Sequence, residues 1–221
     1  MSAVLEADRL YRFYHAGDDE TLALRGVSLA VQPGEIVAVT GPSGSGKSTL
    51  LALLAGLDDP DGGTVWIGGE RLSRRAEEAR ARIRARRVGV LYQLVNLVGH
   101  LDLAGNVRLA QRLRDDDGAP TPVPEILDAV GLRARANLLP RELSGGERAR
   151  AGLAVALAND PDILLCDEPT GELDGAAAER VLVLLRQRAA AGAAVVVVTH
   201  SERVARDADR VLALRDGEAQ E

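Results

Sequence analysis

The chain reads Gly41-Pro42-Ser43-Gly44-Ser45-Gly46-Lys47-Ser48-Thr49 directly after an apolar run at residues 35–40, and its last residues open a second run at residues 47–55. The first run is typical of a buried strand, and the second favours a helix. The segment fits the pattern G-x-x-x-x-G-K-[ST], in which glycines allow backbone N–H groups to surround phosphate oxygens. The helix N-terminus adds a field that attracts anions. We therefore expect a nucleoside triphosphate site, with Lys47 on the phosphates and Ser48 on Mg²⁺.

Lysine occurs once in this chain. All 27 basic residues are arginines except Lys47. An ammonium group is compact and sits on a thin stem, whereas a guanidinium is a wide planar fork. We therefore expect the lysine at a position where a guanidinium does not fit. The competing interpretation is an accidental lysine in a Gly/Ser-rich loop, which the flanking strand and helix disfavour.

Composition indicates the class of protein. The chain has 221 residues, 46% hydrophobic and 27% charged, with a net charge of −6. This balance is typical of one large globular domain or two small ones, and it argues against a protein that mainly coats nucleic acid. The single cysteine, Cys166, excludes an internal disulfide framework. No apolar run reaches 18 residues and the N-terminus lacks a signal-peptide layout, so we expect a cytosolic location.

Short apolar runs alternate with longer amphipathic segments, which predicts an α/β fold. We expect strands at residues 28–31, 35–40, 65–67, 88–92, 163–167, 195–199 and 211–214, and helices at residues 47–55, 73–86, 124–130, 145–158, 176–191 and 201–208. Gln32-Pro33-Gly34 predicts a turn that joins two strands into a hairpin, and Asp216-Gly217 predicts a second hairpin. Residues 94–143 contain no convincing strand, so we expect a helical insertion there.

Two acidic residues end the apolar run at residues 163–167. Asp167 and Glu168 are neighbours on a predicted strand, so their side chains point to opposite faces and can have different roles. Asp167 is suited to the Mg²⁺ shell opposite Ser48, and Glu168 is suited to orienting or deprotonating an attacking water. An ordinary solvated strand end is the alternative, and the nearby phosphate motif weakens it.

A second candidate anion site is Ser144-Gly145-Gly146-Glu147, at the start of an Ala-rich helix. Helix capping alone explains Ser144 with Glu147 three residues later. It does not explain two consecutive glycines in the first turn, each of which costs about 1 kcal/mol relative to alanine. Close approach of a ligand to the backbone does explain them.

Taken together, these motifs resemble the ATP-binding subunits of ABC transporters. Their order carries the resemblance: GPSGSGKS, Gln93 after an apolar strand, LSGGE, ILLCDEP, Leu173-Asp174, and His200 after VVVVT. The forms DEPTGxLD and ALRGVSL look most like the group that serves macrolide export, lipoprotein release and cell division. The resemblance implies a P-loop NTPase core with an N-terminal antiparallel β subdomain and an inserted helical subdomain. It implies one domain over residues 1–221, with the core at 1–93 and 159–221 and the insertion at 94–158.

The resemblance also implies roles for individual residues. Tyr14 would stack on adenine, with Tyr11 as the competitor, and His200 would contact the γ-phosphate beside Glu168 and Lys47. Gln93 would join Ser48 and Asp167 on Mg²⁺. Ser144, Gly145, Gly146 and Glu147 would clasp the ATP of a second subunit, and Asp174 would cross the same interface. His15 and His100 are expected to have no such role.

The implied partners are a second copy of the chain, paired head to tail, and an integral membrane permease, with no nucleic acid. ATP would close the pair on the cytoplasmic face of the membrane, and residues 94–107 would transmit the motion. Two alternatives stay open: mechanical signalling across the envelope without a transported substrate, and a soluble ABC ATPase acting on ribosomes or DNA. The chain departs from the family pattern at Arg148, Ala149, Val155 and Glu172, which affects the signature helix and the dimer interface.

Residues 71–87 hold eight arginines and two glutamates in an otherwise acidic chain. A patch for nucleic acid or anionic lipid is one interpretation. The solvated face of a surface helix is the other, and the absence of aromatic residues for base stacking favours it.

Overall fold

The computed structural model describes residues 3–16, 19–92, 97–114, 120–171 and 173–220. In these residues it contains two β-sheets. A four-stranded antiparallel sheet has the order β2-β1-β4-β5, and a six-stranded sheet has the order β10-β9-β3-β8-β7-β6. The first sheet consists of β1 (Leu5–Ala16), β2 (Asp19–Val31), β4 (Gly62–Ile67) and β5 (Glu70–Arg71). The second consists of β3 (Ile36–Thr40), β6 (Val88–Leu91), β7 (Ile163–Asp167), β8 (Ala194–Val198), β9 (Arg210–Arg215) and β10 (Glu218–Gln220).

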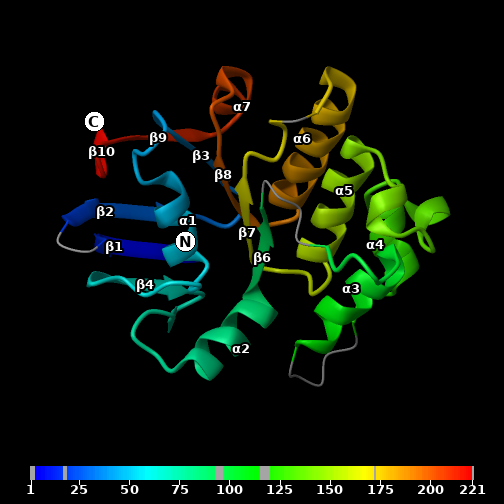
Figure 1. Cartoon of the computed structure of the whole chain (residues 1–221), viewed down its shortest axis with the longest axis horizontal. Helices are drawn as coiled ribbons and strands as arrows, with labels where there is room; N and C mark the ends of the chain where they lie inside the picture. The colour runs from blue at the N-terminus through cyan, green and yellow to red at the C-terminus, as the bar shows by residue number, and fades with distance from the viewer. Residues whose placement is uncertain (1–2, 17–18, 93–96, 115–119, 172, 221) are drawn as a thin grey trace.

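The helices lie on both sides of the six-stranded sheet (Figure 1). Strands β3, β6, β7, β8 and β9 run parallel, so their carboxyl ends meet at one edge. The helices are α1 (Lys47–Leu54), α2 (Glu77–Arg87), α3 (Leu103–Arg112), α4 (Val123–Ala129), α5 (Gly145–Ala156), α6 (Gly175–Ala190) and α7 (Glu202–Arg206). Two 3₁₀ segments, Arg133–Arg135 and Pro140–Glu142, precede α5. No helix in these ranges is long and apolar enough to cross a membrane.

Alternate residues of the central strands enter two different cores. Leu165 and Val196 pack into a cluster that holds the leucines of α1 and the inner faces of β1 and β2. Their neighbours Leu164 and Val195 point the other way, into a cluster formed with α3, α4, α5 and α6. Because both faces are covered, these strands are apolar along their whole length. Helix α1 is therefore held between the two sheets, with its N-terminus at the carboxyl edge of the parallel strands (Figure 1).

The parallel strands were predicted within a residue or two, since β6, β7 and β8 lie at the expected runs. The antiparallel sheet was largely missed. β1 was not expected, and β2 begins at Asp19 rather than residue 28. Polar and charged residues occupy both faces of β1 beyond Leu10, and its register with β2 shifts three times, so the period-two pattern is broken. Helix α3 had no predicted bounds, and α2 begins at Glu77, four residues later than expected.

The prediction of a hairpin at Gln32-Pro33-Gly34 is wrong. The turn itself forms, since the Glu35 amide donates to the Gln32 carbonyl at 3.1 Å and Gly34 has a φ of 82°. However, β2 and β3 on either side of it belong to different sheets, so the turn joins the sheets instead of pairing two strands. The second hairpin is confirmed, because β9 and β10 pair antiparallel around Asp216 and Gly217.

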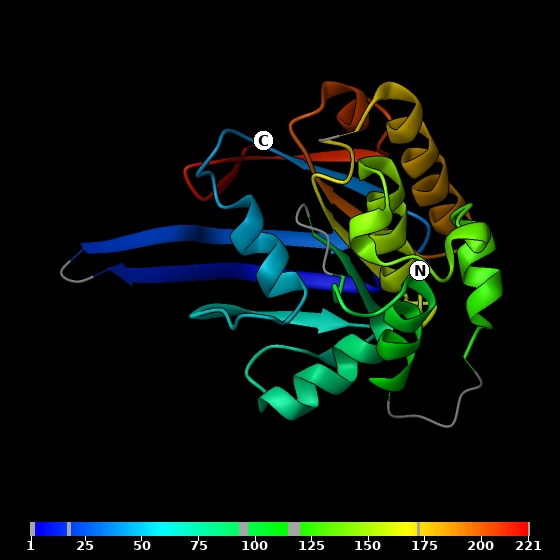
Figure 2. The ribbon, with the colours of Figure 1, turned by 45° about the vertical axis from the view of Figure 1, so that its right-hand side comes forward.

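The segment between β6 and β7 contains helices and no strand in its described residues, as expected. Figure 2 shows α3, α4 and α5 grouped beside α6, apart from the antiparallel sheet. The first residues of this segment, 93–96, lie outside the described ranges, and the exact subdomain boundaries stay a prediction.

The arginine-rich segment is largely paired within the protein. Its arginines contact carboxylates of β5, of α2 and of neighbouring loops, in the pairs Arg75–Glu70, Arg86–Glu70, Arg80–Asp59, Arg80–Glu77, Arg82–Glu78, Arg84–Glu77 and Arg87–Asp162. This internal pairing favours the interpretation as a helix face over that of a free basic patch.

Candidate functional site

The phosphate loop (residues 41–48) joins β3 to α1, as the sequence predicts. Lys47 is the first residue of α1 and is only 7% exposed. Its ammonium donates to the carbonyls of Gly41 and Pro42, both at 2.8 Å, so the side chain folds back over its own loop. Burial lowers the pKa of Lys47, while the carboxylates of Glu168 and Asp167 oppose that shift. A buried cation held above a ring of backbone groups is suited to an anionic ligand.

Two glycines show why the loop needs this sequence. Gly41 has a φ of 149°, and a Cβ there would lie 2.1 Å from the Leu214 carbonyl oxygen of β9. Gly44 has a φ of 78°, and a Cβ there would meet nothing within 4 Å. The first glycine therefore allows close packing against β9, whereas the second leaves the loop surface open. Ser45 is 2% exposed, and its hydroxyl has no partner in the described structure.

The two acids lie across from the loop, at the carboxyl end of β7. Glu168 has a φ of 46°, in the left-handed region, and its amide donates to the Val198 carbonyl of β8 at 2.9 Å. Such a conformation is strained for a non-glycine residue and is held by its surroundings. Asp167 ends the strand itself. Burial raises the pKa of Asp167, while Lys47 and His200 oppose that rise, so a further cation would stabilise its charged form.

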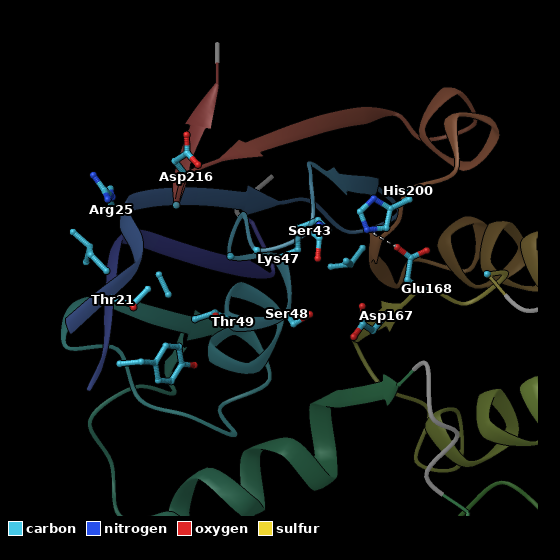
Figure 3. A pocket seen from close by; sticks show the side chains of 18 residues that line it. Thr21, Arg25, Ser43, Lys47, Ser48, Thr49, Asp167, Glu168, His200 and Asp216 are labelled. Carbon is cyan, nitrogen blue, oxygen red and sulfur yellow. Dashed lines mark ion pairs between the residues drawn. The ribbon is translucent and has the colours of Figure 1, made fainter. Parts of the chain in front are cut away.

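Glu168 is oriented by β8 and the residues after it. The Thr199 hydroxyl donates to Glu168 Oε2 at 3.4 Å, and His200 Nε2 lies 3.6 Å from Oε1 (Figure 3). The Glu168 side chain is 14% exposed, and Oε1 has no hydrogen-bond partner in the described residues. This carboxylate therefore has one oxygen anchored by Thr199, whereas the other, Oε1, is buried beside His200 and lacks a hydrogen-bond donor among those residues.

A cavity of about 800 Å³ connects these groups. Figure 3 shows Lys47, Ser48 and Thr49 on the α1 side, and Asp167, Glu168 and His200 on the side of β7 and β8. Of the other residues that the sequence predicts, Tyr14, Ser43, Gly44 and Gly46 also line the cavity, whereas Tyr11 does not. Sequence reasoning missed eight lining residues: Thr21, Leu22, Ala23, Arg25, Gly171, Val198, Asp216 and Gly217.

Six of these eight residues come from β2 and from the tip of the β9–β10 hairpin. The Gly217 amide donates to the Ser45 carbonyl at 3.2 Å, and the Arg25 amide donates to the Gly217 carbonyl at 2.8 Å. These bonds join segments far apart in the chain. The one signal available from sequence was the Asp216-Gly217 turn, which gives no information about what the turn contacts.

The residues 144–147, here called the α5 end, do not line the cavity. Ser144 and Glu147 form the predicted capping box: the Glu147 amide donates to Ser144 Oγ at 3.3 Å, and the Ser144 amide donates to Glu147 Oε2 at 2.9 Å. The Ser144 amide and Arg135 Nε, at 2.9 Å, lower the pKa of Glu147 to about 2. Ser144 and Gly145 are exposed, and a Cβ on Gly145 would meet nothing within 4 Å.

Asp174 is also exposed and lies away from the cavity, where it caps α6 by accepting from the Ala177 amide at 2.7 Å. The prediction for Gln93 falls outside the described residues, as does that for Glu172. Among the described residues no cluster of three or more His, Cys, Asp and Glu side chains is arranged to hold a metal. The predicted Mg²⁺ ligands Ser48 and Asp167 both face the cavity (Figure 3).

Comparison with known proteins identifies the family. A family model described as "ABC transporter" matches residues 24–171. The chain belongs to the ABC transporter family. It is an ATPase of the ABC type, and the predicted P-loop NTPase fold with a β subdomain and a helical insertion is confirmed.

Similar ABC proteins match over nearly their whole length. The chain is 41% identical to a lipoprotein-releasing system ATP-binding protein, LolD, of Pseudomonas fluorescens, over 97% of this chain and 96% of the relative. It is also 41% identical to an uncharacterised ABC transporter ATP-binding protein of Escherichia coli, over 99% and 97%. A dimeric structure of a bacterial ABC transporter cassette, MJ0796, superposes with a TM-score of 0.91 at 36% identity, over 98% and 97% of the chains. The same cassette is known in a post-hydrolysis state bound to ADP and Pi.

Proposed function

We propose that this ABC ATPase powers an export-type membrane complex through ATP-driven pairing of two copies of the chain. The observation that carries the proposal is the meeting, in one cavity, of the Lys47 ammonium, the Ser48 hydroxyl and the carboxylates of Asp167 and Glu168. These are the groups that phosphoryl transfer from a nucleoside triphosphate to water requires. The nucleotide-bound cassette of similar fold supports the same substrate.

The phosphate loop fits a triphosphate in shape and charge. The open surface at Gly44, the orphan hydroxyl of Ser45 and the start of α1 present donors to an anion. Lys47 exchanges its bonds to two carbonyls for bonds to phosphate oxygens. Ser48 and Asp167 would hold Mg²⁺, which neutralises charge on the phosphates when it is bound. The base end of the cavity contains Tyr14, the residue we assign to adenine stacking.

Glu168 is the group we assign to the attacking water. Its anchored oxygen, Oε2, accepts from Thr199, and its unpartnered oxygen, Oε1, accepts a proton or a hydrogen bond from the water. His200, which lies beside Oε1, is half exposed and faces the cavity, where it can contact the terminal phosphate. Water attacks in line, the bond from phosphorus to the leaving oxygen breaks, and the phosphate loop retains ADP.

The α5 end requires a second copy of the chain in this proposal. Ser144 and Gly145 present an exposed, capped helix N-terminus that contacts no part of the cavity in its own chain. A head-to-tail pair places each α5 end on the nucleotide bound by the other copy. The dimeric cassette of similar fold supports this arrangement. Asp174, exposed at the start of α6, belongs to the same interface.

A groove of about 450 Å³ at the edge of the six-stranded sheet is the contact we assign to a membrane permease. It lies between α2, β6, α3 and α5, and its lining includes Val90, Tyr92 and Val155. Leu57 and Leu113 at its rim are 47% and 67% exposed, so they extend the apolar lining of the groove to the surface, where a partner could contact it. The expected transmitting segment, residues 94–107, includes the first residues of α3. Ala110 of this helix and Leu113, which follows it, line the groove.

The substrate class we propose is a lipid-bearing cargo, with this chain bound to the cytoplasmic face of the membrane. The names of relatives such as the Pseudomonas fluorescens protein, a subunit of a lipoprotein-releasing system, support this class. Cargo selection would then lie in the permease, whereas this chain supplies the ATP-driven motion.

The test is capture of membrane partners by the Glu168→Gln variant in the presence of ATP and Mg²⁺, followed by mass spectrometry. The variant should bind ATP while hydrolysis falls by about a hundredfold or more, so the ATP-bound pair accumulates on its partner. We expect an integral membrane protein with a large extracytoplasmic domain. Near-normal turnover would remove Glu168 as the base, and recovery of ribosomal or DNA-associated proteins alone would contradict the membrane role.

A matched pair of variants tests the groove in the same experiment. Leu113→Asp in the Glu168→Gln background should lose the membrane protein but keep ATP-driven pairing, because Leu113 is the more exposed of the two leucines at the groove rim. Val183→Asp, an exposed position of α6 away from the groove, is the control and should retain capture. Loss of capture in both variants would show a general effect of the added charge.

A further inference from the structure

Arg12, an arginine with no role assigned above, lies against Tyr14 at one end of the cavity. The guanidinium carbon of Arg12 lies 4.9 Å from the centre of the Tyr14 ring. Tyr14 lines the cavity and is 41% exposed, whereas Arg12 is not among the lining residues. The guanidinium therefore covers the ring from outside the cavity, and the ring retains an accessible face. This is the geometry of a cation–π contact.

Arg12 is fixed by two carboxylates. Its Nε and Nη2 donate to Asp58 at 2.8 and 3.0 Å, a bidentate pair, and its Nη1 donates to Asp61 at 3.1 Å. Burial alone would lower the pKa of Arg12, but its contacts with Tyr14, Asp61 and Asp58 outweigh that effect and raise it. The side chain is 21% exposed, so it is a partly buried cation with a fork geometry that lysine does not reproduce.

The same two carboxylates also hold the backbone and hydroxyl around Tyr14. Asp61 accepts from the Phe13 amide at 2.8 Å, and this bond, with Arg12, holds the pKa of Asp61 below its ordinary value. The Tyr14 hydroxyl lies 3.4 Å from Asp58 Oδ2. Asp58 and Asp61 belong to the connection between α1 and β4. The group ties strand β1 to the far end of the helix that begins at Lys47.

We propose that Arg12, clamped by Asp58 and Asp61, is a positioning residue that holds Tyr14 as a stacking surface for the purine base of the bound nucleotide. The inference rests on the proposed function, because it requires a nucleotide with its phosphates at Lys47. Arg12 sets the ring at a fixed distance from the phosphate loop. Its charge also draws electron density toward the covered face, which favours an electron-rich purine on the open face.

The test compares Arg12→Ala with wild type in the binding of ATP and of inorganic tripolyphosphate. Arg12→Ala should raise the Kd and KM for ATP about five- to tenfold, in the range expected for a partly desolvated cation–π contact. The kcat at saturating ATP and the Kd for tripolyphosphate should stay unchanged, because the phosphate loop is intact. Arg12→Lys, which keeps the charge but not the bidentate clamp, should recover part of the affinity for ATP.

Two controls separate positioning from a general structural effect. Arg9→Ala, an exposed position of the same strand, should bind ATP as wild type does. In a Tyr14→Ala background the additional change Arg12→Ala should cost nothing further. Equal losses for ATP and tripolyphosphate, or unchanged ATP binding in Arg12→Ala, would overturn the inference. Failure of the wild-type protein to bind ATP would instead overturn the proposed function, whatever Arg12 does.

Discussion

The phosphate loop and the α5 end both place glycines at a helix N-terminus, yet their surroundings in the fold differ. The loop lies in a cavity, with Lys47 buried and two carboxylates across from it. The α5 end is exposed, satisfies its own caps through Ser144 and Glu147, and faces no cavity of its own chain. A similar local chemistry therefore produces one enclosed site and one open surface.

The difference lies in what covers each helix start. Helix α1 begins where the carboxyl ends of β3, β8 and β7 meet, so Asp167, Glu168 and His200 are brought to it by the sheet. Helix α5 begins after a 3₁₀ segment in the helical insertion, and the sheet supplies nothing at its start. In the proposed function, the phosphate loop is an enclosed half-site that binds a ligand alone, whereas the α5 end is an open half-site that needs a second copy of the chain.

The largest expected effect comes from breaking the enclosed half-site with Lys47→Ala. Affinity for ATP should fall by at least about a hundredfold, because a buried charge-assisted contact to phosphate is lost. Lys47→Arg should also fail, since the guanidinium is too wide for a position where one ammonium contacts two carbonyls. Titration calorimetry measures both, and ATP binding at wild-type strength in either variant would contradict the assignment of the loop.

A smaller effect is expected at the open half-site, from Gly145→Ala. A Cβ there meets no described atom within 4 Å, and alanine favours a helix by up to about 1 kcal/mol over glycine. The monomer should therefore fold at least as stably and bind ATP as before. Turnover and ATP-driven dimer formation should fall about tenfold, because the new methyl group stands where a partner's phosphate would approach bare N–H groups. Light scattering with and without ATP measures the dimer.

Gly146→Ala is the matched control for that variant. A Cβ at this position would lie 2.9 Å from Ala177 Cβ, so the substitution should lower the thermal midpoint of the monomer. If Gly145→Ala also destabilised the monomer, or if it left ATP-driven dimers intact, the interface role of the α5 end would be contradicted.

The enclosed half-site was also the part of the molecule that sequence predicts best. A buried strand, a glycine-rich loop and a helix start follow one another within residues 35–55, so their geometry is fixed locally. The acids at the end of β7 were found for the same reason: a run of four apolar residues, 163–166, is followed by Asp167 and Glu168. Both predictions succeeded because each motif is contiguous in the sequence.

The rest depends on contacts that no local pattern records. The cavity wall at Arg25 and Gly217 exists because β2 packs against the β9–β10 hairpin. The clamp around Arg12 joins residues 46 and 49 positions apart in the chain. β1 was missed because its bulges break the alternation that identifies a strand. Pairing at such separations is set by the packing of whole elements.

The smallest expected effect is on stability, from removal of the Glu147 charge at the α5 end. The pKa of Glu147 is about 2, below its ordinary 4.5, so its stabilising contribution is present above about pH 4.5 and is lost as pH falls toward 2. Glu147→Gln keeps the capping geometry but loses the ion pair with Arg135, and should cost about 0.5–1 kcal/mol at pH 7. The difference in unfolding free energy between the variant and wild type, measured by chemical denaturation, should shrink as the pH falls from 4.5 to 3.

The control is an Arg135→Ala background, in which Glu147→Gln should lower the unfolding free energy at pH 7 by less. A difference that stays constant with pH would show that the charge of Glu147 does not stabilise this helix start.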